Sequence, residues 1–137
     1  MGSITWKFVK QLKDDTNINE YEAKYITLPI DLREVIAEYN GARPNKKIFD
    51  TLNTKERVFN SLISFRKEDK MNIFFVMEYL AKDFPENLYP FGVDPFGNYI
   101  CILNNASKEV VFYDNDTNII EKICNTFTEF CEMLREE

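Results

Sequence analysis

Acidic side chains gather in one stretch of the sequence, between Asp83 and Asp116. Six carboxylates lie there against a single base, Lys108, so the stretch carries −5 of the chain's net charge of −6. Clustered carboxylates can hold a divalent metal ion, work as an acid–base pair or attract a basic partner. They can also form only a solvated rim on a structural hairpin, because charge by itself says little about function.

The acids of this stretch do not form a standard calcium loop. Asp114, Asp116 and Asn118 have the spacing of its first three ligands, but the sixth position is isoleucine instead of glycine and the twelfth is asparagine instead of glutamate. Two alternatives stay open. Asp94, Asp114 and Asp116 could converge as a divalent site, or they could be the paired carboxylates of a hydrolase, which requires at least two of them to meet in one pocket.

The chain lacks the residues of most other catalytic and metal sites. It has no histidine, the commonest general base and metal ligand, and its four glycines form no phosphate-binding loop. Its cysteines, at positions 101, 124 and 131, lack the paired spacing of a zinc site and are predicted to be buried reduced thiols. We therefore predict no catalytic residue, no cofactor, no metal and no enzymatic activity.

Composition favours a protein of the cytoplasm that binds neither nucleic acid nor membrane. The pI near 4.8 disfavours nucleic-acid binding, which requires clustered lysine and arginine. No apolar run approaches the roughly 20 residues that span a bilayer, and no secretory signal pattern opens the sequence. Aromatic residues make up 15% of the chain, and we expect most of them in the core.

A hairpin is predicted to position the acidic stretch. Tyr99–Leu103 and Val110–Tyr113 are rich in β-branched and aromatic residues and are separated by small and polar residues. Residues 94–98, with the sequence Asp-Pro-Phe-Gly-Asn, have the composition of a tight turn. Neither strand alternates between polar and apolar residues, so both faces should be covered and the pair should lie centrally in a sheet.

Helical spacing of apolar residues predicts several helices. The clearest starts at Leu28-Pro29 and ends at Asn40-Gly41, and its stripe is expected to be buried against the sheet that holds Tyr99–Leu103. The stripe consists of Leu32, Val35, Ile36 and Tyr39. The other predicted helices cover residues 4–14 with Ser3 as N-cap, a short segment with Tyr21 and Tyr25, residues 73–82, and a last helix opened by the capping box Thr126-x-x-Glu129.

Between these helices the pattern predicts strands over Ile48–Leu52 and Arg57–Phe65, with Phe59, Ile63 and Phe65 on one face. Residues 119–124 fit either an extended chain or a helix. The region Arg43–Lys70 is basic, opposite in sign to the hairpin. This order of elements predicts a single α+β domain over residues 1–137, with a mainly antiparallel sheet packed with N-terminal and C-terminal helices.

Four short motifs resemble the SUKH superfamily, also called the Smi/Knr cell-wall-regulator-like family. They are Leu28-Pro29-x-Asp31 running into Tyr39-Asn40-Gly41-Ala42-Arg43-Pro44, then Tyr89-Pro-Phe-Gly-x-Asp94-Pro-Phe-Gly-Asn98-Tyr-Ile-Cys101, then Val111-Phe-Tyr-Asp-Asn-Asp116, and Phe127-x-x-Phe130-x-x-x-Leu134. The resemblance spans about residues 21–134. Two positions depart from the family pattern: Ala42 replaces a glycine and Asn115 replaces a histidine.

The resemblance implies an α+β domain without catalysis. Bacterial members are mostly immunity proteins that neutralise a cognate toxin domain, often a nuclease, whereas fungal members act as regulatory scaffolds. We therefore expect an immunity protein of the cytoplasm that occludes a basic toxin domain. A scaffold for an endogenous partner and a carboxylate-based hydrolase are the alternatives. The residues predicted to contact the partner are Glu86, Tyr89, Asp94, Phe96, Asn98, Asp114 and Asp116, with Phe96 the aromatic side chain most exposed.

Overall fold

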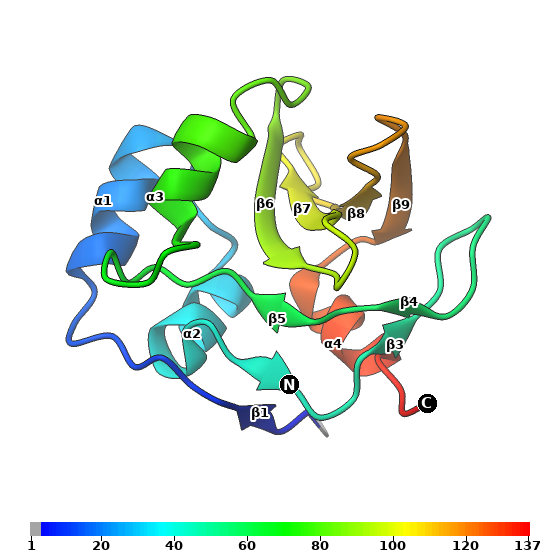
Figure 1. Cartoon of the computed structure of the whole chain (residues 1–137), viewed down its shortest axis with the longest axis horizontal. Helices are drawn as coiled ribbons and strands as arrows, with labels where there is room; N and C mark the ends of the chain where they lie inside the picture. The colour runs from blue at the N-terminus through cyan, green and yellow to red at the C-terminus, as the bar shows by residue number, and fades with distance from the viewer. Residues whose placement is uncertain (1–3) are drawn as a thin grey trace.

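The computed structural model describes residues 4–137, so the predicted N-cap Ser3 lies outside the described residues. Five strands form one antiparallel sheet in the order β5-β6-β7-β8-β9. They are β5 (Ser61–Leu62), β6 (Leu88–Val93), β7 (Tyr99–Leu103), β8 (Val110–Tyr113) and β9 (Ile120–Cys124). The α+β class and the largely antiparallel sheet are confirmed (Figure 1).

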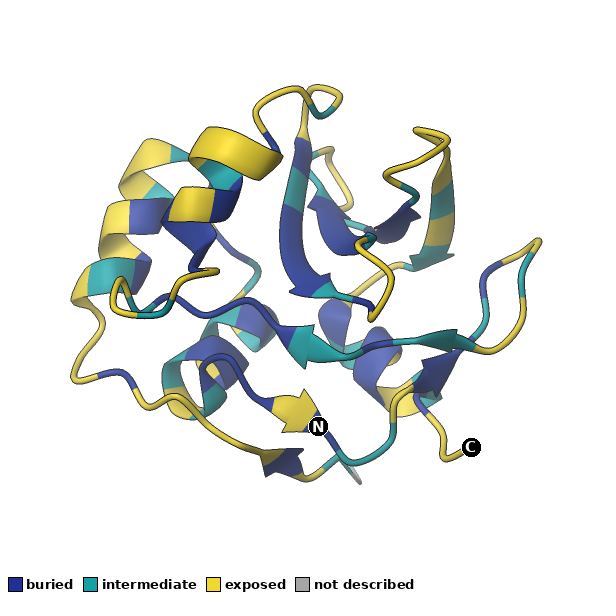
Figure 2. Ribbon diagram, viewed as in Figure 1, coloured by how far each residue is buried: buried dark blue, intermediate teal, exposed yellow. Residues whose placement is uncertain are grey.

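The predicted hairpin is the centre of this sheet. β7 pairs with β8 from Tyr99↔Tyr113 to Ile102↔Val110, and β6 and β9 flank the two strands. All four residues of β8 are buried, as are the first four of β7, which explains why the sequence does not alternate. The ambiguous segment 119–124 is β9, an edge strand that is mostly exposed or half-buried (Figure 2).

Helices cover the sheet and close the core. α1 (Thr16–Lys24) lies beside α3 (Ile73–Phe75) and the π-helical turn η1 (Val76–Leu80), whereas α2 (Ile30–Tyr39) packs against α4 (Phe127–Met133). The first three residues of the predicted α2 stripe are buried in the same core as the sheet strands. Tyr39, the fourth, is half-buried and stacks on Trp6 with ring centroids 6.3 Å apart.

The predicted start of the last helix at Thr126 is confirmed, with Thr126 as the N-cap of α4. The hydroxyl of Thr126 accepts a hydrogen bond from the backbone N–H of Glu129 at 3.0 Å. Asp31, at the start of α2, reaches the same helix end, because its carboxylate accepts bonds from the backbone N–H and the hydroxyl of Thr128 at 2.9 and 2.8 Å. One acid therefore ties the starts of α2 and α4 together.

The helix predicted over residues 4–14 is wrong. Residues 6–7 form strand β1 (Trp6–Lys7), which pairs with β2 (Arg43–Pro44), and Phe8 has a left-handed backbone with a φ of 58°. The apolar spacing was misleading because Phe8 and Val9 are exposed, while Trp6 and Leu12 are the residues that reach the core. Tertiary pairing with β2 outweighs a weak local helical pattern here.

The long strand predicted over residues 57–65 is divided in two. β4 (Arg57–Val58) pairs with β3 (Ile48–Phe49), whereas β5 pairs with β6, so the chain changes partner near Phe59. The predicted buried face is confirmed, since Phe59, Ile63 and Phe65 are all buried. The segment is thus extended but serves two sheets.

Candidate binding surface

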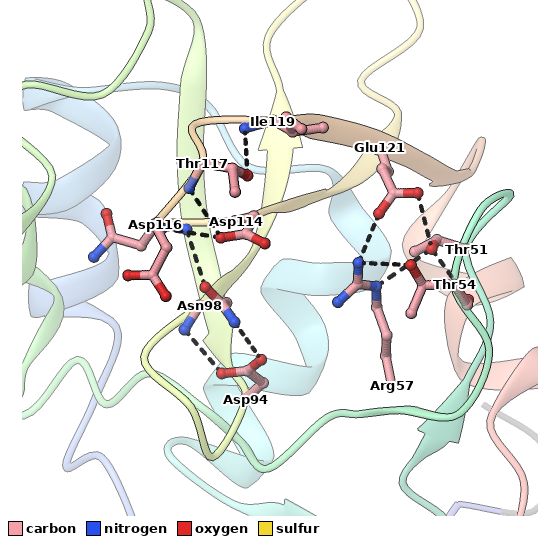
Figure 3. A network of polar contacts seen from close by, with 11 residues as sticks. Thr51, Thr54, Arg57, Asp94, Asn98, Asp114, Asp116, Thr117, Ile119 and Glu121 are labelled. Carbon is pink, nitrogen blue, oxygen red and sulfur yellow. Dashed lines mark hydrogen bonds and ion pairs between the residues drawn. The ribbon is translucent and has the colours of Figure 1, made fainter.

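Two turns of the predicted contact region meet at one end of the sheet. The β6–β7 turn covers residues 94–98 and the β8–β9 turn covers residues 114–119, and an antiparallel meander brings alternate turns to the same edge. The side-chain amide of Asn98 joins them: its Nδ2 donates to Asp94 Oδ2 at 3.0 Å, and its Oδ1 accepts the backbone N–H of Asn115 at 3.0 Å. Figure 3 shows this chain of contacts from Asp94 to Asp114.

Asp94 is committed to its own turn. Its Oδ1 accepts the backbone N–H groups of Phe96 and Asn98, both at 2.8 Å, and the residue is only 7% exposed. This is an Asx-type turn, in which a carboxylate organises the backbone that follows it. Asp94, which was predicted to contact a partner, is therefore a buried structural acceptor, because the turn uses both of its oxygens.

Asp114 plays the matching part in the second turn. Its Oδ1 accepts the backbone N–H groups of Asp116 and Thr117 at 2.9 and 3.2 Å, and the residue is half-buried. Asp116 is exposed. The substitution of asparagine for histidine at position 115 leaves the link between the turns intact, since Asn115 takes part through its backbone N–H.

The turns hold apolar side chains in solvent. Phe96 is 78% exposed, which confirms the expectation that it is the most exposed aromatic side chain of this region. Phe91 and Tyr99 are buried. Ile119, which the sequence did not single out, is 57% exposed at the end of the second turn. We call Phe96, Asp114, Asp116 and Ile119 the turn surface.

Glu86 and Tyr89 lie at the opposite end of the sheet. Leu88 pairs with Leu103 and Val93 pairs with Tyr99, so β6 separates the two ends by about 17 Å at roughly 3.3 Å per residue. Glu86 is exposed, and Tyr89 is half-buried and packs on the core. The structure thus gathers five of the seven predicted contact residues and leaves these two apart.

A clamp of opposite charges lies beside the turn surface. Arg57 Nη2 contacts Glu121 Oε1 at 2.7 Å, and its guanidinium lies 3.8 Å from the centroid of the Phe112 ring. Thr51 donates a further bond to Glu121. Arg57, which the sequence placed in a basic region, is therefore neutralised locally and fastens β4 to the edge strand β9.

The arrangement offers little to hydrolytic chemistry. Asp94 and Asp114 accept hydrogen bonds from donors in their own turns. These two acids therefore act as structural acceptors. Burial, the largest cause, raises the pKa of Cys124 and of Cys131 to about 12 and that of Cys101 well above its ordinary value, which keeps the thiols protonated. Within residues 4–137, no group of three or more acidic or cysteine side chains is arranged to hold a metal ion.

No helix in the described part of the chain is long and apolar enough to cross a bilayer.

Comparison with known proteins identifies the family. The family model SUKH_6, described as SMI1-KNR4 cell-wall, matches residues 15–131. No curated protein and no solved structure matches the chain significantly. The matched range contains the first three motifs and the fourth as far as Cys131, and the residues of those motifs build the helix ends and turns described above. The chain belongs to the SMI1-KNR4 (SUKH) family.

Proposed function

We propose that this chain is a non-enzymatic immunity protein of the cytoplasm, which binds a cognate toxin domain and covers its basic active-site cleft. The observation that carries the proposal is the exposed ring of Phe96, held on a turn that Asp94 and Asn98 make rigid. A rigid exposed aromatic loses little conformational freedom when a partner covers it, and such residues dominate binding energies at protein interfaces. Family membership supports the proposal.

The acids of the turn surface supply the electrostatic part. Asp116 is exposed in the β8–β9 turn, which Asn98 links to the turn that holds Phe96, and the chain as a whole carries a net charge of −6. A nuclease cleft that binds polyanions is basic, so this surface attracts it and speeds association. Asp94 and Asn98 then serve as supports behind the contact, whereas Glu86 and Tyr89 lie too far away to share a small interface with Phe96.

The test starts with a partner, namely a toxin domain encoded next to this gene, and asks whether the two proteins co-purify. Binding kinetics then separate the roles. We expect Asp116→Lys to lower the association rate constant, with an effect that shrinks as salt rises, because screening acts over about 8 Å at physiological ionic strength. We expect Phe96→Ala mainly to raise the dissociation rate constant.

Matched controls lie elsewhere on the surface. Glu86→Lys makes the same charge change at the other end of the sheet, and Leu52→Ala removes an apolar side chain that is 90% exposed. Equal effects of Asp116→Lys and Glu86→Lys, or of Phe96→Ala and Leu52→Ala, would exclude the turn surface as the interface. Recovery of an endogenous partner, with no neutralised toxin, would instead favour the scaffold role.

A further inference from the structure

A groove of about 760 Å³ lies on another side of the β6–β7 turn. Its walls come from the segment after β1, from β2, from β5 and from the loop before α3, and Val93 and Gly97 join it to the turn. In Figure 1 the two-stranded sheet of β1 and β2 lies below β5. The volume of the groove falls within the roughly 300–1,000 Å³ typical of ligand sites.

The floor of the groove is rigid. Asn40, fully buried, donates to Lys10 O at 2.8 Å and to Ser64 Oγ at 3.0 Å, and accepts the backbone N–H of Phe65 at 2.7 Å. Gly41 follows with a φ of +67°, and a Cβ there would lie 3.1 Å from Lys10 Cδ. The sequence explains Asn40-Gly41 as a helix stop, but the pair also ties three segments together under the groove.

The rim presents apolar side chains to solvent. Phe8 is 74% exposed, and its backbone is left-handed, a conformation rare for an aromatic residue. The guanidinium of Arg43 lies 5.7 Å from the centroid of the Phe8 ring. Met71, on the loop before α3, is 52% exposed. Apolar groups that line a groove and remain exposed are common at binding sites.

The exposed charges that face the groove are mostly cations. Lys10, Arg43 and Lys70 line it as exposed cations. Among the lining carboxylates, Asp94 is used by its turn, and Asp69 accepts bonds from Ser64 at 2.6 Å and from Arg66 at 3.2 Å. Glu68 is the remaining acid of the lining. The exposed charges of the groove are thus three cations and one carboxylate. The charge of Asp69 is offset by Arg66, and Asp94 keeps its charge but is buried, so the groove is weakly positive within a protein that is acidic overall.

We propose that this groove binds an acidic peptide segment of a partner protein, one that also carries an apolar side chain. Carboxylates of the segment pair with Lys10, Arg43 and Lys70, and its apolar side chain packs between Phe8 and Met71. The planar guanidinium of Arg43 suits a carboxylate in particular. A long polyanion fits less well, because the net charge of −6 repels it outside the groove. The groove adjoins the β6–β7 turn through Asp94 and Gly97, but none of the four residues of the turn surface lines it, and the inference does not depend on a toxin partner.

Selection from a random peptide library displayed on phage, with the full chain immobilised, tests the proposal. We expect enriched peptides to combine acidic residues with an aromatic or aliphatic one. Fluorescence anisotropy then measures the labelled consensus peptide on Arg43→Glu/Lys70→Glu and on the matched control Lys55→Glu/Lys82→Glu, which makes the same charge change at exposed sites outside the groove. Losing two partly exposed ion pairs should weaken binding about tenfold in the groove variant, and the control should bind like the parent chain.

Three results would overturn the proposal: no acidic consensus, equal weakening in both double variants, or a labelled oligothymidylate that binds as tightly as the peptide. Fluorescence of Trp6, the only tryptophan, confirms that each variant is folded. A second, milder variant, Met71→Ala, covers the case in which the double variant does not fold, and its effect on the peptide should exceed that of Leu52→Ala. The kinetics with a toxin domain are a separate measurement, so failure of either proposal leaves the other standing.

Discussion

Replacing Asp94 should destabilise the fold, although this acid was predicted from the sequence to contact a partner. Its carboxylate accepts three hydrogen bonds, at 2.8, 2.8 and 3.0 Å, from the turn that it begins. Hydrogen bonds to a charged group contribute about 1.5–3 kcal/mol each, but the freed N–H groups near the surface regain water. We therefore expect Asp94→Ala to lower the free energy of unfolding by about 2–4 kcal/mol.

Asp94→Asn should cost less, about 1–2 kcal/mol, because its Oδ1 still accepts the two backbone N–H groups. Its new amide meets the amide of Asn98, which can rotate only by giving up the backbone N–H of Asn115. For 137 residues, at about 2.1 cal/mol/K of unfolding entropy per residue, 1 kcal/mol corresponds to roughly 3.5 °C in Tm. The expected loss for Asp94→Ala is then about 7–14 °C.

Urea denaturation followed by Trp6 fluorescence measures these differences, since Trp6 is buried against Tyr39 and Phe59. Asp116→Ala is the matched control, an exposed acid two residues beyond the corresponding Asp114, and should change stability by less than about 0.5 kcal/mol. If Asp94→Ala were no more destabilising than Asp116→Ala, the carboxylate would not organise the turn. Our assignment of Asp94 as a support for Phe96 would then be wrong.

Three further outcomes follow from buried contacts. Asn40→Ala should lower the free energy of unfolding by about 3–5 kcal/mol in the same urea assay, because the buried N–H of Phe65 loses its acceptor and two other bonds are lost; a loss below 1 kcal/mol would contradict the network. Gly92→Ala should cost at least about 2 kcal/mol, since its Cβ would lie 2.6 Å from Phe59 Cε1, and Phe59→Leu in the same chain should recover part of the loss. At pH 8 the three thiols of the native protein should react slowly with a thiol-specific disulfide reagent, because burial raises their pKa values. All three should react at once when urea unfolds the chain. Rapid reaction of Cys124 in the native protein would refute its protonated state.

The sequence predicted those elements whose local pattern and tertiary role agree. Residues 99–103 and 110–113 form the predicted strands, because β-branched and aromatic residues without alternation suit a strand that is covered on both faces. The helix that starts at Ile30 and the N-cap of α4 at Thr126 rest on local signals in the same way. Local chemistry decides such elements, and the structure confirms them.

Tertiary pairing decided the elements that the sequence misjudged. Residues 4–14 have helical spacing, yet the pairing of Trp6 with Pro44 draws the segment into a strand and leaves Phe8 in solvent. No local signal separates the apolar residue that reaches the core from the one that does not. The strand predicted over residues 57–65 changes partner for the same reason, since two different strands lie within its reach.

The candidate surfaces divide in the same way. By itself the sequence identified the acidic stretch, the turn at residues 94–98 and the exposure of Phe96, because composition and turn chemistry are local properties. Only the tertiary structure decided that Asp94 faces its own turn, that Glu86 lies at the far end of the sheet, and that Lys10, Arg43 and Lys70 share one groove. The direction of a carboxylate and the distance between residues remote in sequence depend on how strands pair, and strand pairing is a property of the whole chain.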